Sequence, residues 1–173
     1  MIAGIDVGKI SFMAVLKNDK IVYLGKLRFD LPVKYVGIDA PLNLPERGFR
    51  KCEKKLLNMG IRVIPPLFLK KIHKIGVEIA KEFEKRGAKV YEVYPYATRY
   101  VLGWKWSKRS EEGRKNIVKG LKEFLDFPET DDHNEIDAII SALTVKFYIE
   151  GYFELCDNFI LPSLARPLPK SKV

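Results

Sequence analysis

The chain has 173 residues and carries 31 Lys and Arg against 22 Asp and Glu, a formal net charge of +9. This length suits one domain that can bury a core without disulfides. No apolar run reaches membrane-spanning length, and the N-terminus lacks a basic region followed by a small-residue cleavage site, so we expect a soluble cytoplasmic protein. The two cysteines match no metal-binding spacing and indicate reducing surroundings.

The first forty residues predict four strands. Residues 2–6 form the first strand, and alternating apolar residues on either side of Asn18-Asp19-Lys20 predict a hairpin over 11–29. Residues 35–39, "YVGID", are apolar up to the final acid and predict a strand buried on both faces, as a central parallel strand would be. The link from Phe29 to Tyr35 is too short for a crossover helix, so either the connection is an unusually short loop or the strand boundaries differ.

From residue 46 the apolar spacing becomes helical. Helices are predicted over 46–60, 67–86, 97–103, 110–127 and 131–151, with an extended piece at 61–66 and a fifth strand at 88–95 that ends in a proline. This order predicts an α/β fold: a mixed five-stranded sheet, with three antiparallel N-terminal strands plus two parallel strands, flanked by helices. Residues 1–160 form a single domain, followed by a Pro-rich basic tail at 161–173.

Acidic residues occur where these strands end. Asp6 follows Gly4-Ile5, Asp39 follows Gly37-Ile38, and Glu92 lies in the fifth strand. Parallel sheets of α/β proteins bind ligands at the carboxyl ends of their strands. Each acid alone is explained by a cap or by an ion pair with one of the many Lys and Arg residues, but three together favour a shared site.

The last helix brings further polar residues toward the sheet. At about 100° per residue, Asp132, His133 and Asp137 fall within or beside the apolar stripe of this helix. An acid at a helix start is explained by capping, which accounts for Asp131 and suits Asp132. Capping does not explain Asp137, which lies beyond the first turn.

Carboxylates gathered in this way suit hard divalent cations such as Mg²⁺ and Mn²⁺. Two such ions held by shared carboxylates activate a water and stabilise the leaving oxygen of a phosphodiester. The positive net charge indicates a polyanionic partner such as nucleic acid. It is equally typical of a thermophile surface rich in Lys and Glu.

The ordered segments "GIDVG", "GIDAPLNLP", "RKCEKKL", "YEVYPYA" and "DDHNEIDAIISAL" resemble the domain-of-unknown-function 429 family, predicted nucleases of the RNase H fold. The resemblance runs from about Ile2 to Leu143. More distantly, the strand-end Asp and the helical His…Asp resemble the Holliday junction resolvase group of that superfamily. The short link between Phe29 and Tyr35 departs from the pattern.

The resemblance implies an RNase H-like fold and a set of metal ligands. Asp6 is the implied central ligand, with Asp39, Glu92 and Asp137 completing the set and Asp132 as a further member. His133 is expected to position water or to shuttle a proton. Arg50 and Glu53 match the family's "R-x-CE" segment, whose role the resemblance does not supply.

Nucleic acid is expected to contact a set of basic and aromatic residues. Aromatic rings interleaved with cations stack on bases and hold phosphates, although a core anchor with a lid explains the tryptophans equally well. The expected contact residues are Arg50, Trp104, Lys105, Trp106, Lys108 and Arg109. The sequence leaves the oligomeric state open, a homodimer included.

Three functions follow from these observations. The leading hypothesis is a nuclease that uses two Mg²⁺ or Mn²⁺ ions. The second is an inactive nucleic-acid-binding module of the same fold. The third, suggested by the actin-like "GIDVGK", is a nucleotide phosphotransferase, against which the chain shows no later Gly-rich phosphate loop.

Overall fold

A computed structural model describes residues 1–163 and 165. Its core is one seven-stranded sheet, in the order β3-β2-β1-β4-β5-β7-β6. The strands are β1 (Ile2–Asp6), β2 (Phe12–Lys17), β3 (Lys20–Lys26), β4 (Tyr35–Asp39), β5 (Lys89–Glu92), β6 (Phe153–Cys156) and β7 (Phe159–Pro162). β1, β2 and β3 are antiparallel, whereas β4 and β5 run parallel to β1. The predicted mixed α/β fold is thus confirmed, with two strands more than expected.

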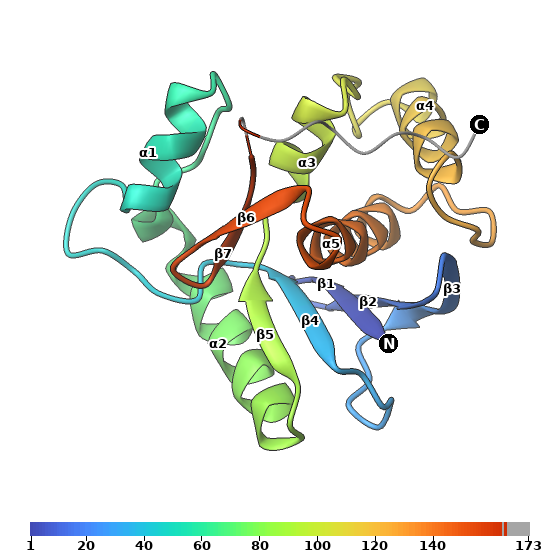
Figure 1. Cartoon of the computed structure of the whole chain (residues 1–173), viewed down its shortest axis with the longest axis horizontal. Helices are drawn as coiled ribbons and strands as arrows, with labels where there is room; N and C mark the ends of the chain where they lie inside the picture. Colours follow the sequence, from blue (N-terminus) through green and yellow to red (C-terminus); the bar gives the residue numbers. More distant parts are fainter. Residues whose placement is uncertain (164, 166–173) are drawn as a thin grey trace.

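Helices cover both faces of this sheet. They are α1 (Lys51–Asn58), the 3-10 helix η1 (Pro66–Leu69), α2 (Lys70–Lys85), α3 (Pro95–Val101), α4 (Glu111–Lys122) and α5 (His133–Ile149). α2 lies on one face and α5 on the other, beside α3 and α4 (Figure 1). The helix predicted over 67–86 is divided, since Pro66 begins a 3-10 turn before α2. None of the helices in the described residues is long and apolar enough to cross a bilayer.

The short link before β4 is an extended crossover. Residues 27–34 run from the end of β3 back to the start of β4 without helix. Their alternate apolar residues Leu27, Phe29, Leu31 and Val33 pack against the core on the α2 face of the sheet. A chain rises about 3.3 Å per residue when extended, so eight residues span the sheet where a helix of that length would not. Both alternatives left open by the sequence apply: β3 ends at Lys26, three residues before the predicted end of the hairpin, and the connection that follows is a short extended segment without helix.

β6 and β7 form a hairpin that the sequence interpretation did not include. The turn is Asp157-Asn158, with Asp157 at φ +54°, and β7 pairs with β5 at Phe159. Leu161 and Pro162, assigned from the sequence to the tail, are the last residues of β7, and Leu161 is buried. The domain thus extends past residue 160. Most of the predicted tail lies outside the described residues.

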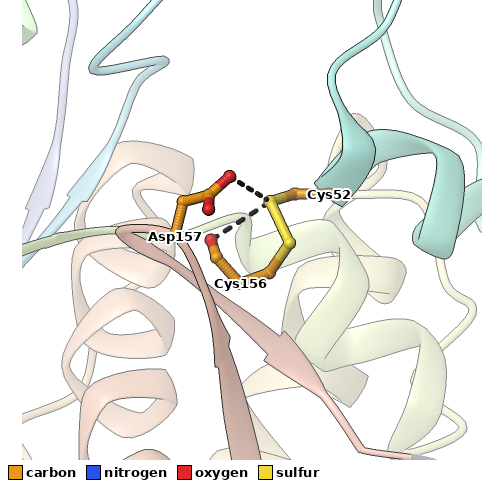
Figure 2. Close-up of side chains that lie close together, drawn as sticks. All are labelled: Cys52, Cys156 and Asp157. Atoms are coloured by element: carbon orange, nitrogen blue, oxygen red, sulfur yellow. Dashed lines mark hydrogen bonds between the residues drawn. A yellow bond between two sulfur atoms is a disulfide. The ribbon is translucent and has the colours of Figure 1, made fainter.

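The hairpin is bonded to α1 by a disulfide between Cys52 and Cys156 (Figure 2). This differs from the reduced state that the sequence indicated. The dashed lines in Figure 2 join Cys52 Sγ to the Cys156 carbonyl oxygen at 3.1 Å and to Asp157 Oδ2 at 3.7 Å. They are close contacts, since a disulfide sulfur carries no hydrogen to donate. The same bond prevents these three residues from acting as a thiolate metal site.

The glycine in each "GID" segment lets α5 approach the sheet closely. Gly4 and Gly37 are partners in neighbouring parallel strands. A Cβ on Gly4 would lie under 3.0 Å from the backbone nitrogen of Ala142 and the backbone oxygen of Ala138. Ala138 directly follows Asp137, so the close approach that Gly4 permits also brings Asp137 to the ends of β1 and β4.

We expect Gly4→Ala to destabilise the protein by about 3 kcal/mol or more, because backbone atoms of α5 must move to accept the methyl group. Thermal or urea unfolding measures this change. Gly8→Ala is the matched control: its Cβ would meet a single atom, the Ile10 backbone oxygen at 3.3 Å. Equal stability of the two variants would contradict the close approach of α5.

Candidate metal centre

Three carboxylates meet at one edge of the sheet. Asp6 and Asp39 are the last residues of β1 and β4 and are partners in the parallel register. Asp137 lies one turn into α5 above them. One carboxylate oxygen from each of the three lies within 4.8 Å of the others. We call Asp6, Asp39 and Asp137 the acidic trio. The sequence-predicted acids of two strands and one helix are thus brought together.

The surroundings of the acidic trio favour a bound cation. Burial, and then the neighbouring Asp6 carboxylate, raise the pKa of Asp39 to about 7. Burial also raises the pKa of Asp6, with Lys108 and His133 acting in the opposite direction. Oδ1 of Asp137 is buried without a hydrogen-bond partner among the residues that the structure describes. Crowded carboxylates with raised pKa values and an unpartnered oxygen are what a divalent ion would stabilise. These residues therefore fit Mg²⁺ or Mn²⁺.

Within the described part of the chain, Lys108 is the cation that pairs with the acidic trio. Its Nζ pairs with Oδ2 of Asp137, and only a quarter of its side chain is exposed. Burial lowers the pKa of Lys108, while Asp39 and then Asp6 act to raise it. The residue was predicted to contact nucleic acid, but its ammonium group is directed inward. A lysine in this place neutralises part of the charge that a metal ion would neutralise.

Lys108 and a divalent ion would compete for Asp137. We therefore expect the Lys108→Met variant to bind Mn²⁺ about tenfold more tightly than the natural protein, because the ion no longer has to displace a partly buried, charged hydrogen bond. Isothermal titration with Mn²⁺ measures the affinity. Lys105→Met is the control, since Lys105 is exposed on the same loop and lies over the Tyr100 ring. Weaker Mn²⁺ binding by Lys108→Met than by Lys105→Met would show that the lysine supports the ion instead of competing with it.

Glu92 lies outside the acidic trio because Arg50 and a backbone amide bind its carboxylate. Arg50 donates to Glu92 Oε1 at 2.5 Å and to Oε2 at 2.8 Å, and the Leu42 N–H donates to Oε2 at 2.9 Å. The same guanidinium pairs with Glu53, whose Oε2 also accepts the Arg50 N–H at 2.8 Å and so closes the start of α1. We call Arg50, Glu53 and Glu92 the buried ion-pair cluster. Burial raises the pKa of Glu92, which the hydrogen bonds from Arg50 oppose.

The remaining acids and the histidine lie at the start of α5. Asp132 is the N-cap, and its Oδ1 accepts the Asn134 N–H at 2.7 Å. Both Asp132 and His133 act electrostatically on Asp6, so they are its neighbours, but neither belongs to the acidic trio. His133 is exposed. Asp132 therefore has the capping role that the sequence analysis weighed against metal binding.

The expected nucleic-acid contacts divide into exposed and buried residues. Trp106, Lys105 and Arg109 are exposed on the loop before α4. Trp104 is buried against Phe124 and the α4 backbone at Gly120. The structure thus gives the two tryptophans different environments: Trp104 is a core residue, whereas Trp106 is accessible to a ligand. Arg50 is held in the buried ion-pair cluster, so its charge is not free for a phosphate.

Arg99 is a buried cation that the sequence analysis did not single out. It is only 6% exposed, and its Nη1 donates to the Trp106 carbonyl oxygen at 3.0 Å. Burial lowers the pKa of Arg99, and its charge acts to lower the pKa of Lys108. This contact ties the loop of residues 104–109 to α3. Nothing in the local spacing of α3 marks Arg99 as different from a surface arginine.

Comparisons with known proteins add little to this geometry. No protein-family model matches the chain, and no curated protein is similar to it in sequence. Among solved structures it is similar to T. thermophilus RuvC in complex with a Holliday junction substrate, with a TM-score of 0.45 and 14% identity over 94% of this chain and 99% of that one. Similarity at this level supports neither a shared activity nor a shared substrate.

Proposed function

We propose that this chain is a divalent-metal-dependent nuclease that hydrolyses phosphodiester bonds of DNA or RNA. The observation that carries the proposal is the acidic trio, whose three carboxylates meet from two parallel strands and a helix. Bound Mg²⁺ or Mn²⁺ would supply an activated water and stabilise the leaving oxygen. The net charge of +9 suits a polyanionic substrate.

Each residue of the acidic trio has a defined part in this proposal. Asp6, Asp39 and Asp137 would together hold the metal ions, with Asp6 as the central ligand that the family resemblance implies. His133, exposed and close to Asp6, is placed to hold a water or to accept a proton at the open side of the site. Asp132 orients the start of α5 through its cap.

The strand order and the acids at the strand ends also support an RNase H-like fold and membership of the domain-of-unknown-function 429 family. In that proposal Arg50 and Glu53 are structural residues. They form the start of α1, and Arg50 also binds Glu92, which gives a physical reason for the "R-x-CE" segment.

The proposal is tested by incubating the full chain with single-stranded, duplex, hybrid and branched nucleic acids in Mn²⁺. Asp6→Asn is the matched variant, because it keeps the size of the side chain and removes its charge. We expect cleavage by the natural protein and none above background by the variant. Equal cleavage by both proteins would contradict a metal mechanism at this site.

One observation favours a second candidate, an inactive nucleic-acid-binding module. Lys108 already pairs with Asp137, and a lysine that fills an acidic site permanently would replace the ion. Binding with a steep salt dependence but without cleavage in Mn²⁺ or Mg²⁺ would support this candidate.

A further inference from the structure

An apolar pocket of about 250 Å³ lies directly beside the acidic trio. Asp39 lines one side of it, next to Ala40 and Pro41, which follow β4. The opposite wall is the chain between α1 and α2, with Val63, Ile64 and Leu69. The pocket therefore adjoins the acidic trio through Asp39, and its largely apolar walls differ in chemistry from the acidic trio.

The charge of the pocket excludes a phosphate. Its inner end is formed by the buried ion-pair cluster, in which one guanidinium is shared between two carboxylates. Arg50 also donates from Nη1 to the Asn43 side-chain oxygen at 2.8 Å, so its donors are directed at neighbours within the protein. Asp39 adds a third acid. An anionic group would meet more negative than positive charge here, so the occupant is neutral or carries hydrogen-bond donors.

The size and walls of the pocket suit one flat ring system. Its volume is below the roughly 300–1,000 Å³ of pockets that hold drug-sized ligands. Aliphatic side chains form the wall between α1 and α2, and the half-buried ring of Tyr94 lies at its side. The Tyr94 hydroxyl donates to the Arg62 carbonyl oxygen at 3.1 Å, which holds the ring against that wall. Stacking against such surfaces favours a nucleobase of any identity.

We infer that this pocket binds one unpaired nucleobase of the substrate while the adjoining phosphate lies at the acidic trio. The inference rests on the proposed nuclease function and adds the substrate class. A base in a continuous duplex is stacked and paired, and removing it from the stack is costly. The protein therefore acts on single strands or on sites where a base is already unpaired, in preference to uninterrupted duplex.

The experiment uses the full chain and a set of short single-stranded oligodeoxynucleotides, each with one abasic position. Cleavage in Mn²⁺ and binding in the absence of divalent metal are both measured. We expect one abasic position next to the cleaved bond to lower cleavage about tenfold, in line with the stacking of one base. The unmodified strand should be cleaved faster than the corresponding duplex.

Ile64→Ala tests the pocket from the protein side. Ile64 lines the pocket and is 54% exposed, so its truncation should leave the fold intact. Val22→Ala is the matched control, because Val22 is 50% exposed on β3 at the far edge of the sheet. We expect Ile64→Ala to lose severalfold in cleavage of the intact strand and little in cleavage of the strand abasic at the sensitive position.

The outcomes separate this inference from the proposed function. Cleavage that is unaffected by every abasic position and by Ile64→Ala would contradict nucleobase binding in the pocket, but it would agree with the proposed nuclease function. If no cleavage occurs but binding still depends on one base and on Ile64, the nuclease function would be contradicted and nucleobase binding in the pocket would be supported. If the protein binds none of the oligonucleotides, both the nuclease function and nucleobase binding in the pocket would be contradicted.

Discussion

Asp39→Asn is expected to lower Mn²⁺-dependent cleavage by more than about 100-fold, since even the outer partners of metal ligands commonly contribute 10- to 100-fold. The amide keeps the shape of the side chain but removes the negative charge that would hold an ion beside Asp6. Cleavage rates at saturating Mn²⁺ and the Mn²⁺ affinity measure the effect. Asp126→Asn is the control, because Asp126 pairs with Lys20 in an exposed position on β3's side of the molecule.

The same substitution is expected to change the dependence of stability on pH. In the folded protein the pKa of Asp39 is raised to about 7, against 3.8 for the exposed group. Between about pH 4 and 7 the folded state therefore holds a proton that the unfolded state has lost, so this carboxyl makes the protein less stable as pH rises through that range. In the Asp39→Asn variant the free energy of unfolding should decrease less as pH rises, and the variant should be more stable than the natural protein near pH 8.

Urea unfolding at a series of pH values measures this difference. Added Mn²⁺ should stabilise the natural protein above pH 7, because it binds the ionised carboxylates of the folded state, and should stabilise Asp39→Asn much less. A natural protein whose stability between pH 4 and 8 matches that of Asp39→Asn would contradict the burial of this acid.

The sequence was sufficient to predict five of the seven described strands and the edge of the sheet where Asp6, Asp39 and Asp137 meet. Gly-Ile-Asp occurs in two apolar strands, and parallel strands of equal length bring equivalent positions to the same edge. The structure pairs Gly4 with Gly37 and Asp6 with Asp39 accordingly. The repeated glycine has its own cause, which periodicity does not reveal: the backbone of α5 lies where a Cβ would be.

The partners of individual charges were not predictable in the same way. Glu92 and Lys108 have the residue types of a ligand and of a phosphate contact, and their local sequence offers no reason to prefer Arg50 or Asp137 as partners. These pairs join residues 42 and 29 positions apart, so only the fold brings them together. The β6–β7 hairpin did carry a local signal, since Asp157-Asn158 is a two-residue turn between short apolar runs.

Arg50→Met is expected to destabilise the protein by about 3–5 kcal/mol, the range for removing one partner of a buried ion pair. The guanidinium is the common partner of Glu53 and Glu92, whose side chains are only 5% and 6% exposed. Without it, two buried carboxylates face one another and the start of α1 loses its closing contacts. Urea unfolding at pH 7 measures the loss.

The pH dependence of Arg50→Met distinguishes charge from packing. If the loss arises from uncompensated negative charge, it should shrink as pH falls and Glu92, whose pKa burial already raises, takes up a proton, because its protonated form needs no cation. A loss that arises from packing would be constant with pH. The double variant Arg50→Met/Glu92→Gln should recover part of the stability, since it removes one of the two buried carboxylates that have lost their cationic partner. A constant loss without recovery would show that the buried ion-pair cluster stabilises the fold through shape alone.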